Sequence, residues 1–346
     1  MCDAKTRVAI SPAKAPLIAR AIPERSVPVP GHVSGDLQQV IRSSPVRTAR
    51  AIPRSDEEWR ADVANLDRAE DKPAVIAELL KEFPARIEEH TAAGVHTYTI
   101  TPSQVPFRNR ARAFVYVHGG GYVMSAGELG IDEAVLLAGY SEMRIIAVDY
   151  RMPPDSPFPA AVDDVVAVWR DVVSALDPAN VAIGGTSAGG GLAIAAVMRL
   201  RAMGLPLPGA VYAGTPWVDL TNSGDSMSTN EYLDNGLSGY TGWMMGAARL
   251  YAGAHDVRDP LISPVFGDFS LFPPTILLSG TRDMLLSDTV RTHRKLRAVG
   301  ILAELHVFEA MSHAEYCTFW KTPESREAYC EVTTFLDRHL GHQPKS

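Results

Sequence analysis

The sequence predicts an α/β protein with a mainly parallel central sheet, flanked by helices and covered by a helical cap. After Gly94, apolar strand candidates alternate with helix candidates, and this alternation is typical of a parallel sheet with helices on both faces. The segment 217–260 interrupts the alternation with a long stretch rich in aromatic residues between two strands, which indicates an inserted cap. In such sheets the active site lies at the carboxyl ends of the strands.

The composition limits the class of protein. The chain has 346 residues, of which 46% are hydrophobic and 21% charged, as in ordinary globular proteins. No apolar run is long enough for a membrane span, and the first residues lack the order of a secretory signal. The three cysteines, Cys2, Cys317 and Cys330, are too few for a disulfide framework and favour a reducing compartment. We therefore expect a cytoplasmic protein without stable membrane association.

The charge is unevenly distributed. The net charge is -7, yet residues 1–55 hold nine Lys or Arg against three Asp or Glu, so this arm is basic and the remainder is acidic. The basic residues are scattered among prolines, without aromatic interleaving or helical spacing. This pattern favours a solvated tail or docking segment, and we expect no nucleic-acid binding.

The N-terminal part is expected to be partly helical. Prolines predict mostly irregular backbone up to about residue 55, with a short helix at 34–42 opened by Ser34. Residues 56–92 are expected to be helical, because apolar residues recur at helical spacing, among them Trp59, Val63 and Leu66. We assign 1–92 to an arm and cap helices, 93–216 to the first part of the core, 217–260 to the cap insertion and 261–346 to the second part of the core.

The core elements follow from apolar periodicity. The strand candidates are residues 95–101, 113–118, 144–149, 180–184, 210–215, 275–280 and 303–308. Residues 159–176 predict a helix with a valine-rich stripe and a charged outer face, made of Asp163, Asp164, Arg170 and Asp171. Helix 188–203 is apolar nearly all round in its first three turns, so we expect it to be buried. Residues 285–299 and 324–340 supply further helices.

A glycine-flanked serine stands between a strand candidate and a helix candidate, as Gly185-Thr186-Ser187-Ala188-Gly189. This is the context in which a G-x-S-x-G motif presents a nucleophilic serine on a tight, strained turn. The Ala188 N–H and the dipole of the following helix both favour negative charge at that place. The glycine spacing fits neither a phosphate loop nor a dinucleotide fingerprint. We therefore predict Ser187 as the nucleophile.

A second glycine run, His118-Gly119-Gly120-Gly121, comes directly after the strand candidate 113–118. Acyl transfer needs backbone N–H donors aimed at the substrate oxygen from a second loop, and consecutive glycines allow close approach of the backbone. We therefore expect this run to complete an oxyanion hole. His118 stands before the loop, and we interpret it as a structural residue that ties the loop by hydrogen bonds rather than as the catalytic base.

The nucleophile needs a base and an orienting carboxylate, which follow a G-x-S-x-G serine in the order acid, then histidine. Asp283 lies in the loop after the strand candidate 275–280 and is the predicted acid. Its competitor Asp288 is expected inside the next helix, facing solvent or capping it. His313 follows the last strand candidate and is the predicted base. The remaining candidates fall within a strand, on helix surfaces or in the tail, and are His306, His293, His339 and His342.

The two motifs together resemble those of bacterial esterases related to mammalian hormone-sensitive lipase, and the likeness covers the chain from about residue 30 onward. It includes residues 149–154 and 157–161, although Met152-Pro153 stands where Leu-Ala is common, and Thr186 resembles the GTSAG-type subgroup. The resemblance implies an α/β-hydrolase fold with a helical cap over the acyl and alcohol pockets. It also implies an oxyanion hole formed by Gly119, Gly120 and Ala188, and suggests a homodimer.

These features predict a serine carboxylic-ester hydrolase that acts on short- to medium-chain acyl esters without a cofactor. No metal-binding spacing is present. The candidate lining residues of the substrate pocket are Tyr122, Trp217 and Tyr232. A lactone hydrolase with the same triad and a non-catalytic ligand receptor remain alternatives. A β-lactamase-like S-x-x-K occurs as Ser11 and Lys14, but it lies in the proline-rich arm with no helix to present it.

Overall fold

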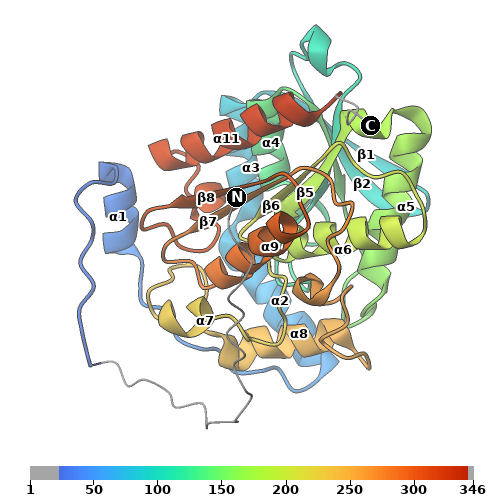
Figure 1. The fold of residues 1–346 in the computed structure, drawn as a ribbon. Coiled ribbons are helices and arrows are strands. Elements are labelled where there is room, and N and C mark those ends of the chain that lie inside the picture. Colours follow the sequence, from blue (N-terminus) through green and yellow to red (C-terminus); the bar gives the residue numbers. More distant parts are fainter. Residues whose placement is uncertain (1–22, 342–346) are drawn as a thin grey trace, which may run out of the picture.

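The computed structural model describes residues 23–341, so the predictions for Cys2, Ser11, Lys14 and His342 lie outside the described residues. Within this range the strands are β1 (Ala85–Ala92), β2 (Val95–Pro102), β3 (Ala113–Val117), β4 (Arg144–Val148), β5 (Val181–Thr186), β6 (Ala210–Gly214), β7 (Thr275–Gly280) and β8 (Ala303–Phe308). They form one sheet in the order β1-β2-β4-β3-β5-β6-β7-β8 (Figure 1). Strand β2 pairs antiparallel with β1 and β4, and all other pairs are parallel.

Helices cover both faces of this sheet, as the sequence predicts. They are α1 (Gly35–Ser43), α2 (Asp56–Glu70), α3 (Lys72–Glu82), α4 (Asp132–Ser141), α5 (Ala160–Ala175), α6 (Ala188–Ala202), α7 (Ser226–Thr229), α8 (Met245–Ala252), α9 (Leu286–Ala298), α10 (Glu315–Thr318) and α11 (Pro323–His339). The predicted opening of α1 is confirmed, since the Ser34 side chain accepts a hydrogen bond from the Leu37 N–H at 3.1 Å. The mainly parallel α/β class is also confirmed.

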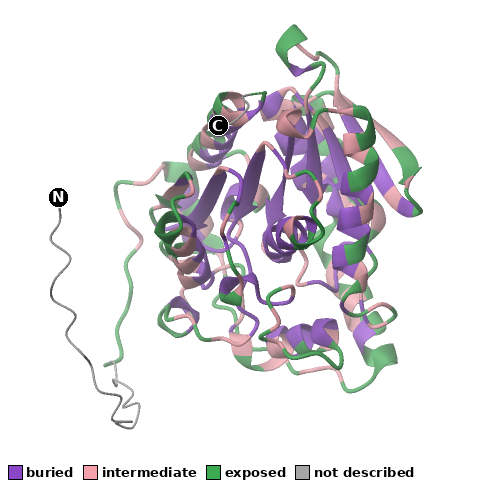
Figure 2. Ribbon diagram, turned by 45° about the vertical axis from the view of Figure 1, so that its right-hand side comes forward, coloured by how far each residue is buried: buried purple, intermediate pink, exposed green. Residues whose placement is uncertain are grey.

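Strand β3 shows how the sheet separates two apolar cores. Val115 and Val117 pack with residues of α5 and α6 on one face, whereas Phe114 and Tyr116 pack with α4 and α11 on the other. A strand that is buried on both faces is apolar throughout, which explains its uninterrupted hydrophobic sequence. Figure 2 shows the sheet as a buried layer inside the helices. Helix α6 is buried over most of its length, as predicted from its apolar circumference.

The prediction that residues 56–92 are helical is wrong for the last part of this range, because α3 ends at Glu82 and strand β1 follows. Strand β1 forms a hairpin with β2, and the two-residue connection Ala93-Gly94 has positive φ at both positions (50° and 86°). This backbone geometry suits a tight turn between twisted antiparallel strands. The strand lies at the edge of the sheet and is largely exposed, so it lacks the apolar alternation that identifies a half-buried strand.

The expected outer face of α5 is correct for three residues and wrong for Asp164. Asp163, Arg170 and Asp171 are exposed, but Asp164 is buried. Its carboxylate accepts two hydrogen bonds from the Arg151 guanidinium, from Nη2 at 2.7 Å and Nε at 2.9 Å, and one from the Arg151 main-chain N–H at 2.8 Å. A buried charge needs such a partner, and Arg151 lies too far along the chain for helical periodicity to reveal it.

The insertion between β6 and β7 contains α7 and α8, and α8 lies beside α2 in the lower part of Figure 1. Helix α8 packs on α2 where Gly246 meets the ring of Trp59, and this ring lies 5.6 Å from that of Trp243. The expected packing of the insertion against an N-terminal helix is therefore present, while the division of the chain into domains stays a prediction. No helix within residues 23–341 has the length and apolarity needed to cross a bilayer.

Candidate active site

Ser187 lies on a sharp turn between β5 and α6. Its backbone has φ 61° and ψ -125°, a strained conformation for a residue with a side chain. The turn is held by the Ser187 N–H, which donates to the Gly214 carbonyl at 2.8 Å. A Cβ on Gly185 or Gly189 would come within 1.9 Å and 2.0 Å of the Val117 carbonyl oxygen, so only glycine fits at either flank. The predicted pentapeptide therefore has a direct steric basis.

The glycine loop after β3 reaches this turn. A Cβ on Gly119 would lie 3.5 Å from the Ser187 Cβ and 3.0 Å from the Thr186 carbonyl oxygen, so the two segments are in van der Waals contact. Among the described residues, no acceptor takes a hydrogen bond from the main-chain N–H of Gly119, Gly120 or Ala188. The third of these groups also stands at the N-terminus of α6. Main-chain donors without an acceptor are the groups that an oxyanion hole needs, and the assignment of these three N–H groups to it stays a prediction.

The structure brings Ser187, Asp283 and His313 together from three different loops. His313 Nε2 lies 2.9 Å from Ser187 Oγ, and His313 Nδ1 lies 3.1 Å from Asp283 Oδ1. Asp283 is fully buried, and its carboxylate also accepts hydrogen bonds from the Leu285 N–H (2.8 Å) and the Ser279 hydroxyl (2.6 Å). These two additional donors fix the orientation of the Asp283 carboxylate, so that it stays directed at the imidazole of His313.

This arrangement determines the tautomer of neutral His313 and shifts the pKa of its imidazole. A carboxylate can only accept, so in the neutral imidazole Nδ1 carries the hydrogen and Nε2 is free to accept from Ser187 Oγ. Burial lowers the pKa of His313, but the charge and hydrogen bond of Asp283 and the charge of Asp234 act in the opposite direction. Together they outweigh burial and raise this pKa above its ordinary value. The imidazolium form is thus stabilised without being the resting form at alkaline pH.

His118 does not occupy the position of the base. It is buried, its Nδ1 lies 2.7 Å from the Gly119 carbonyl oxygen, and its ring stacks on Tyr150 at 4.2 Å. The Tyr150 hydroxyl donates to the His118 carbonyl at 3.0 Å. These contacts agree with the predicted structural role in tying the glycine loop. Burial lowers the pKa of His118, which keeps the imidazole neutral.

The competitor Asp288 lies in α9, as expected, but it does not face solvent. It is buried and accepts hydrogen bonds from the N–H groups of Val218 (3.1 Å) and Asp219 (2.9 Å). Burial and the neighbouring charge of Asp219 raise the pKa of Asp288 well above its usual range. Asp288 therefore anchors the start of the insertion, and its contacts do not include the imidazole of His313.

The three residues predicted to line the substrate pocket occupy different environments. Tyr122 and Trp217 are buried, and the Tyr122 hydroxyl donates to the Trp217 carbonyl at 3.2 Å. The Tyr122 ring stacks on Tyr251 at 4.0 Å, so this group supports the glycine loop from behind. Tyr232 is 60% exposed on the insertion. Contact of these residues with substrate stays a prediction.

A buried polar cluster beneath the serine is absent from the sequence-based prediction. Glu133 of α4 accepts hydrogen bonds from Thr186 Oγ1 (2.7 Å), the Tyr212 hydroxyl (2.9 Å) and the Tyr116 hydroxyl (3.0 Å). Burial raises the pKa of Glu133, while the three donors act in the opposite direction. The cluster ties α4 to the residue before the nucleophile. No local sequence signal marks Glu133, because its three partners lie 17, 53 and 79 residues away along the chain.

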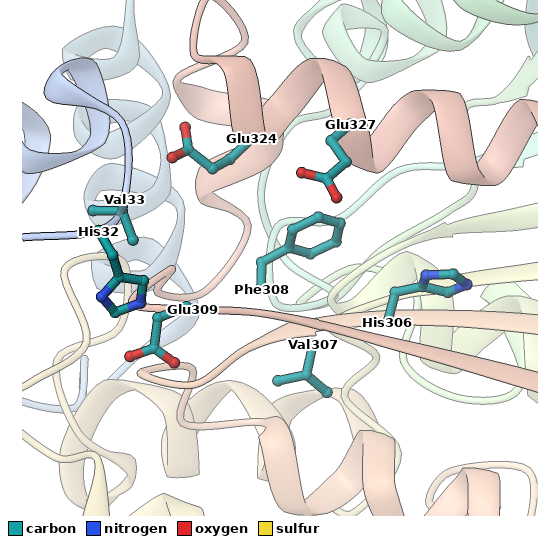
Figure 3. A pocket seen from close by; sticks show the side chains of 8 residues that line it. All are labelled: His32, Val33, His306, Val307, Phe308, Glu309, Glu324 and Glu327. Carbon is teal, nitrogen blue, oxygen red and sulfur yellow. The ribbon is translucent and has the colours of Figure 1, made fainter. Parts of the chain in front are cut away.

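Two cavities lie away from the triad. One, of about 590 Å³, lies between α2 and the loop after β4 and is lined by Asp67, Val123 and Asp149 among others. The other, of about 360 Å³, lies between the segment before α1, the edge strand β8 and α11, as Figure 3 shows. Its lining includes His32, His306 and Glu327. Among the described residues no group of three or more His, Cys, Asp or Glu side chains has the arrangement of a metal site.

The comparisons with known proteins agree with this geometry. A family model described as the α/β-hydrolase fold matches residues 114–317. An acetyl-hydrolase of Streptomyces hygroscopicus is 33% identical over 68% of this chain and 79% of its own length. The putative acetyl-hydrolase LipR of Mycobacterium tuberculosis is 31% identical over 75% of this chain and 82% of its own length. The family match spans both glycine motifs and the loops of the acid and base.

Two solved structures extend the likeness to nearly the whole chain. An esterase designated E25 superposes with a TM-score of 0.90 at 38% identity, covering 93% of this chain and 99% of the other. An esterase of the bacterial hormone-sensitive lipase family superposes with a TM-score of 0.74 at 29% identity, covering 89% and 99%. The chain therefore belongs to the α/β-hydrolase family, among its bacterial esterases of the hormone-sensitive-lipase type.

Proposed function

We propose that this protein is a serine carboxylesterase that hydrolyses short- to medium-chain acyl esters through an acyl-enzyme on Ser187. The observation that carries the proposal is the imidazole of His313, which bridges the Ser187 hydroxyl and the Asp283 carboxylate. In the part of the chain that the structure describes, the main-chain N–H groups of Gly119 and Ala188 have no acceptor, and they belong to the two segments that meet at this serine. This combination supplies a nucleophile, a base, an orienting acid and an oxyanion site, so the reaction needs only these groups and water.

In the proposed mechanism, Ser187 Oγ attacks the ester carbonyl carbon while His313 Nε2 takes the hydroxyl proton. The carbonyl oxygen becomes an oxyanion bound by the N–H groups of Gly119, Gly120 and Ala188. The imidazolium then protonates the alkoxy oxygen, and the alcohol leaves. A water molecule attacks the acyl-enzyme, again giving its proton to Nε2, and the carboxylic acid departs. The transient imidazolium is stabilised by the charge of Asp283 throughout.

The pH dependence follows from the raised pKa of His313. Only the neutral imidazole accepts the Ser187 proton, so kcat/KM should fall as pH drops through this pKa, by about tenfold per unit well below it. Because the neighbouring carboxylates raise the pKa above 6.5, half-maximal kcat/KM is expected above pH 6.5. Initial rates with p-nitrophenyl acetate from pH 5 to 9 measure this fall in kcat/KM, which is the acidic limb of the pH profile. Circular dichroism at each pH shows whether the protein is folded. A midpoint below 6.5 in folded protein would contradict it.

The acyl preference is part of the proposal. The relatives named acetyl-hydrolases support short acyl groups. Hydrolysis of p-nitrophenyl esters from acetate to dodecanoate, together with γ- and δ-lactones, tests this preference. We expect kcat/KM to be largest for the shortest chains, and a maximum at dodecanoate would overturn the acyl assignment. Higher kcat/KM for a lactone would instead favour the lactone-hydrolase alternative, which uses the same triad.

The non-catalytic receptor alternative is less well supported, because the position of His313 within hydrogen-bonding distance of Ser187 Oγ is what turnover requires. Absence of a burst and of turnover with every ester and lactone tested would favour the receptor. The homodimer, the GTSAG-type subgroup and the cytoplasmic location stay predictions.

A further inference from the structure

Asp234 is a buried carboxylate next to the triad that the mechanism does not use. It lies in the insertion between α7 and α8 and is 1% exposed. Its Oδ2 accepts a hydrogen bond from the Met284 N–H at 2.8 Å, directly after the predicted acid. Its Oδ1 lies 3.3 Å from the His313 N–H. One carboxylate therefore contacts the main chain of both the acid loop and the base loop.

The local turn explains only part of this placement. Asp234 Oδ1 also accepts from the N–H groups of Gly236 (2.7 Å) and Leu237 (3.1 Å), a common way for Asp to close a turn. This role does not account for Oδ2, whose partner Met284 is 50 residues away. Within residues 23–341, no Lys or Arg side chain forms a salt bridge with Asp234 that would compensate its burial. A buried carboxylate that has hydrogen-bond donors but no cationic partner is costly, and such groups concentrate at functional sites.

Two further side chains of the insertion bind the same acid loop. The Ser226 hydroxyl donates to the Met284 carbonyl at 2.8 Å, and Asn230 Nδ2 donates to the Asp283 carbonyl at 2.8 Å. Ser226 lies in α7, whereas Asn230 and Asp234 follow the end of this helix, and all three side chains contact the main chain of the acid loop. The base loop is contacted as well, since a Cβ on Gly236 would lie 2.8 Å from the His313 carbonyl oxygen. The insertion therefore packs against the loops that carry both the acid, Asp283, and the base, His313.

We propose that Asp234 is a positioning residue, which holds the acid loop and the base loop at the separation that places the His313 imidazole between Asp283 and Ser187. The inference rests on the proposed function, because it assigns these three residues to the triad. It gives the insertion a second role besides covering the substrate: any displacement of the segment 226–237 also displaces the acid and the base.

The charge of Asp234 supplies a second, measurable contribution. The titratable groups whose charges act on Asp234 are Asp283 and His313. The neighbouring Asn235 contacts a third carboxylate, since its Nδ2 donates to Glu315 Oε1 at 2.7 Å. Burial, followed by the charge of Asp283, raises the pKa of Asp234 to about 6. Asp234 is therefore ionised at neutral and alkaline pH, where it contributes to the raised pKa of His313. Removing its charge should lower the pKa of His313.

The test compares Asp234→Asn with Asp288→Asn in the full chain. Asp288 is the control, because it is a buried carboxylate that likewise accepts hydrogen bonds from main-chain N–H groups, two against the four of Asp234, but does not contact the triad. We expect Asp234→Asn to lower kcat for p-nitrophenyl acetate by on the order of 100-fold, as a displaced catalytic group does, with little change in KM. The acidic limb of kcat/KM should move to lower pH. Neither change is expected for Asp288→Asn.

Three outcomes separate the hypotheses. If Asp234→Asn and Asp288→Asn have the same kcat and the same pH for the fall in kcat/KM, the positioning role is refuted, while the assignment of the triad is unaffected. Activity retained by Ser187→Ala, measured in parallel, would instead refute the proposed function itself. If Asp234→Asn does not fold, Asp234→Glu replaces it, because this variant keeps the charge on a longer side chain. Asp234→Glu should then lower kcat without moving the limb, and an unchanged kcat would contradict the proposal.

Discussion

Replacing Ser187 by alanine is expected to lower kcat for p-nitrophenyl acetate by about 10⁴-fold or more, as removal of a triad nucleophile does. The side chain contacts His313, whereas the turn itself is held by main-chain hydrogen bonds to Gly214 and Trp217. The variant should therefore fold with a melting temperature close to that of the wild type. Stopped-flow and steady-state rates, normalised to folded protein, measure the effect.

The control for this variant is a serine that does not contact the triad, such as Ser270 in the loop before β7, whose N–H and hydroxyl both donate to Asp268. Ser270→Ala should retain the wild-type rate. Turnover by Ser187→Ala above a few per cent of the wild type, in protein free of contaminating esterase, would mean that another group is the nucleophile.

The acid is expected to show the second largest effect. In Asp283→Asn, kcat should fall by roughly 10⁴-fold, the loss known for the equivalent change in a serine triad. Asp283 Oδ1 accepts from the Leu285 N–H and Oδ2 from the Ser279 hydroxyl, so an amide NH₂ would oppose one of these donors or the imidazole in either orientation. It would favour the wrong tautomer of His313.

The comparison variant for the acid is Asp288→Asn, which should keep kcat within about twofold of the wild type once both proteins are shown to be folded. Circular dichroism and thermal unfolding establish the folded fraction, and kcat/KM with p-nitrophenyl acetate gives the activity. The reverse result, with Asp288→Asn inactive and Asp283→Asn active, would exchange the two assignments.

The regular elements were predictable because their signals are local. Strand β5, the serine turn and α6 follow from an apolar run, two glycines and an apolar helix, and each requirement is met within about ten residues. Strand β1 was not predictable, because it is an exposed edge strand stabilised by pairing with β2 rather than by burial of an apolar face. Its only local signal is the Ala93-Gly94 turn.

The residues of the candidate site also fall into two groups, those that the sequence predicts and those that it does not. Ser187, Asp283 and His313 could be proposed because each follows a recognisable strand, and strand ends of a parallel sheet share one edge. Asp234 and Glu133 could not, since their roles depend on contacts with residues 50 or more positions away. Asp164 is predicted to face solvent and Asp288 to face solvent or cap its helix, because the sequence does not reveal their partners, which lie 13 and about 70 positions away. A carboxylate in a helical segment is predicted to be exposed unless its distant partner is known.

The central claim is that the hydroxyl of Ser187 is an activated nucleophile, and its reaction with a fluorophosphonate tests this claim most directly. The native protein should be labelled stoichiometrically, peptide mass spectrometry should place the adduct on Ser187, and His313→Ala should react far more slowly because the hydroxyl has lost its base. An adduct on another residue, or no adduct on folded protein that hydrolyses esters, would contradict the account.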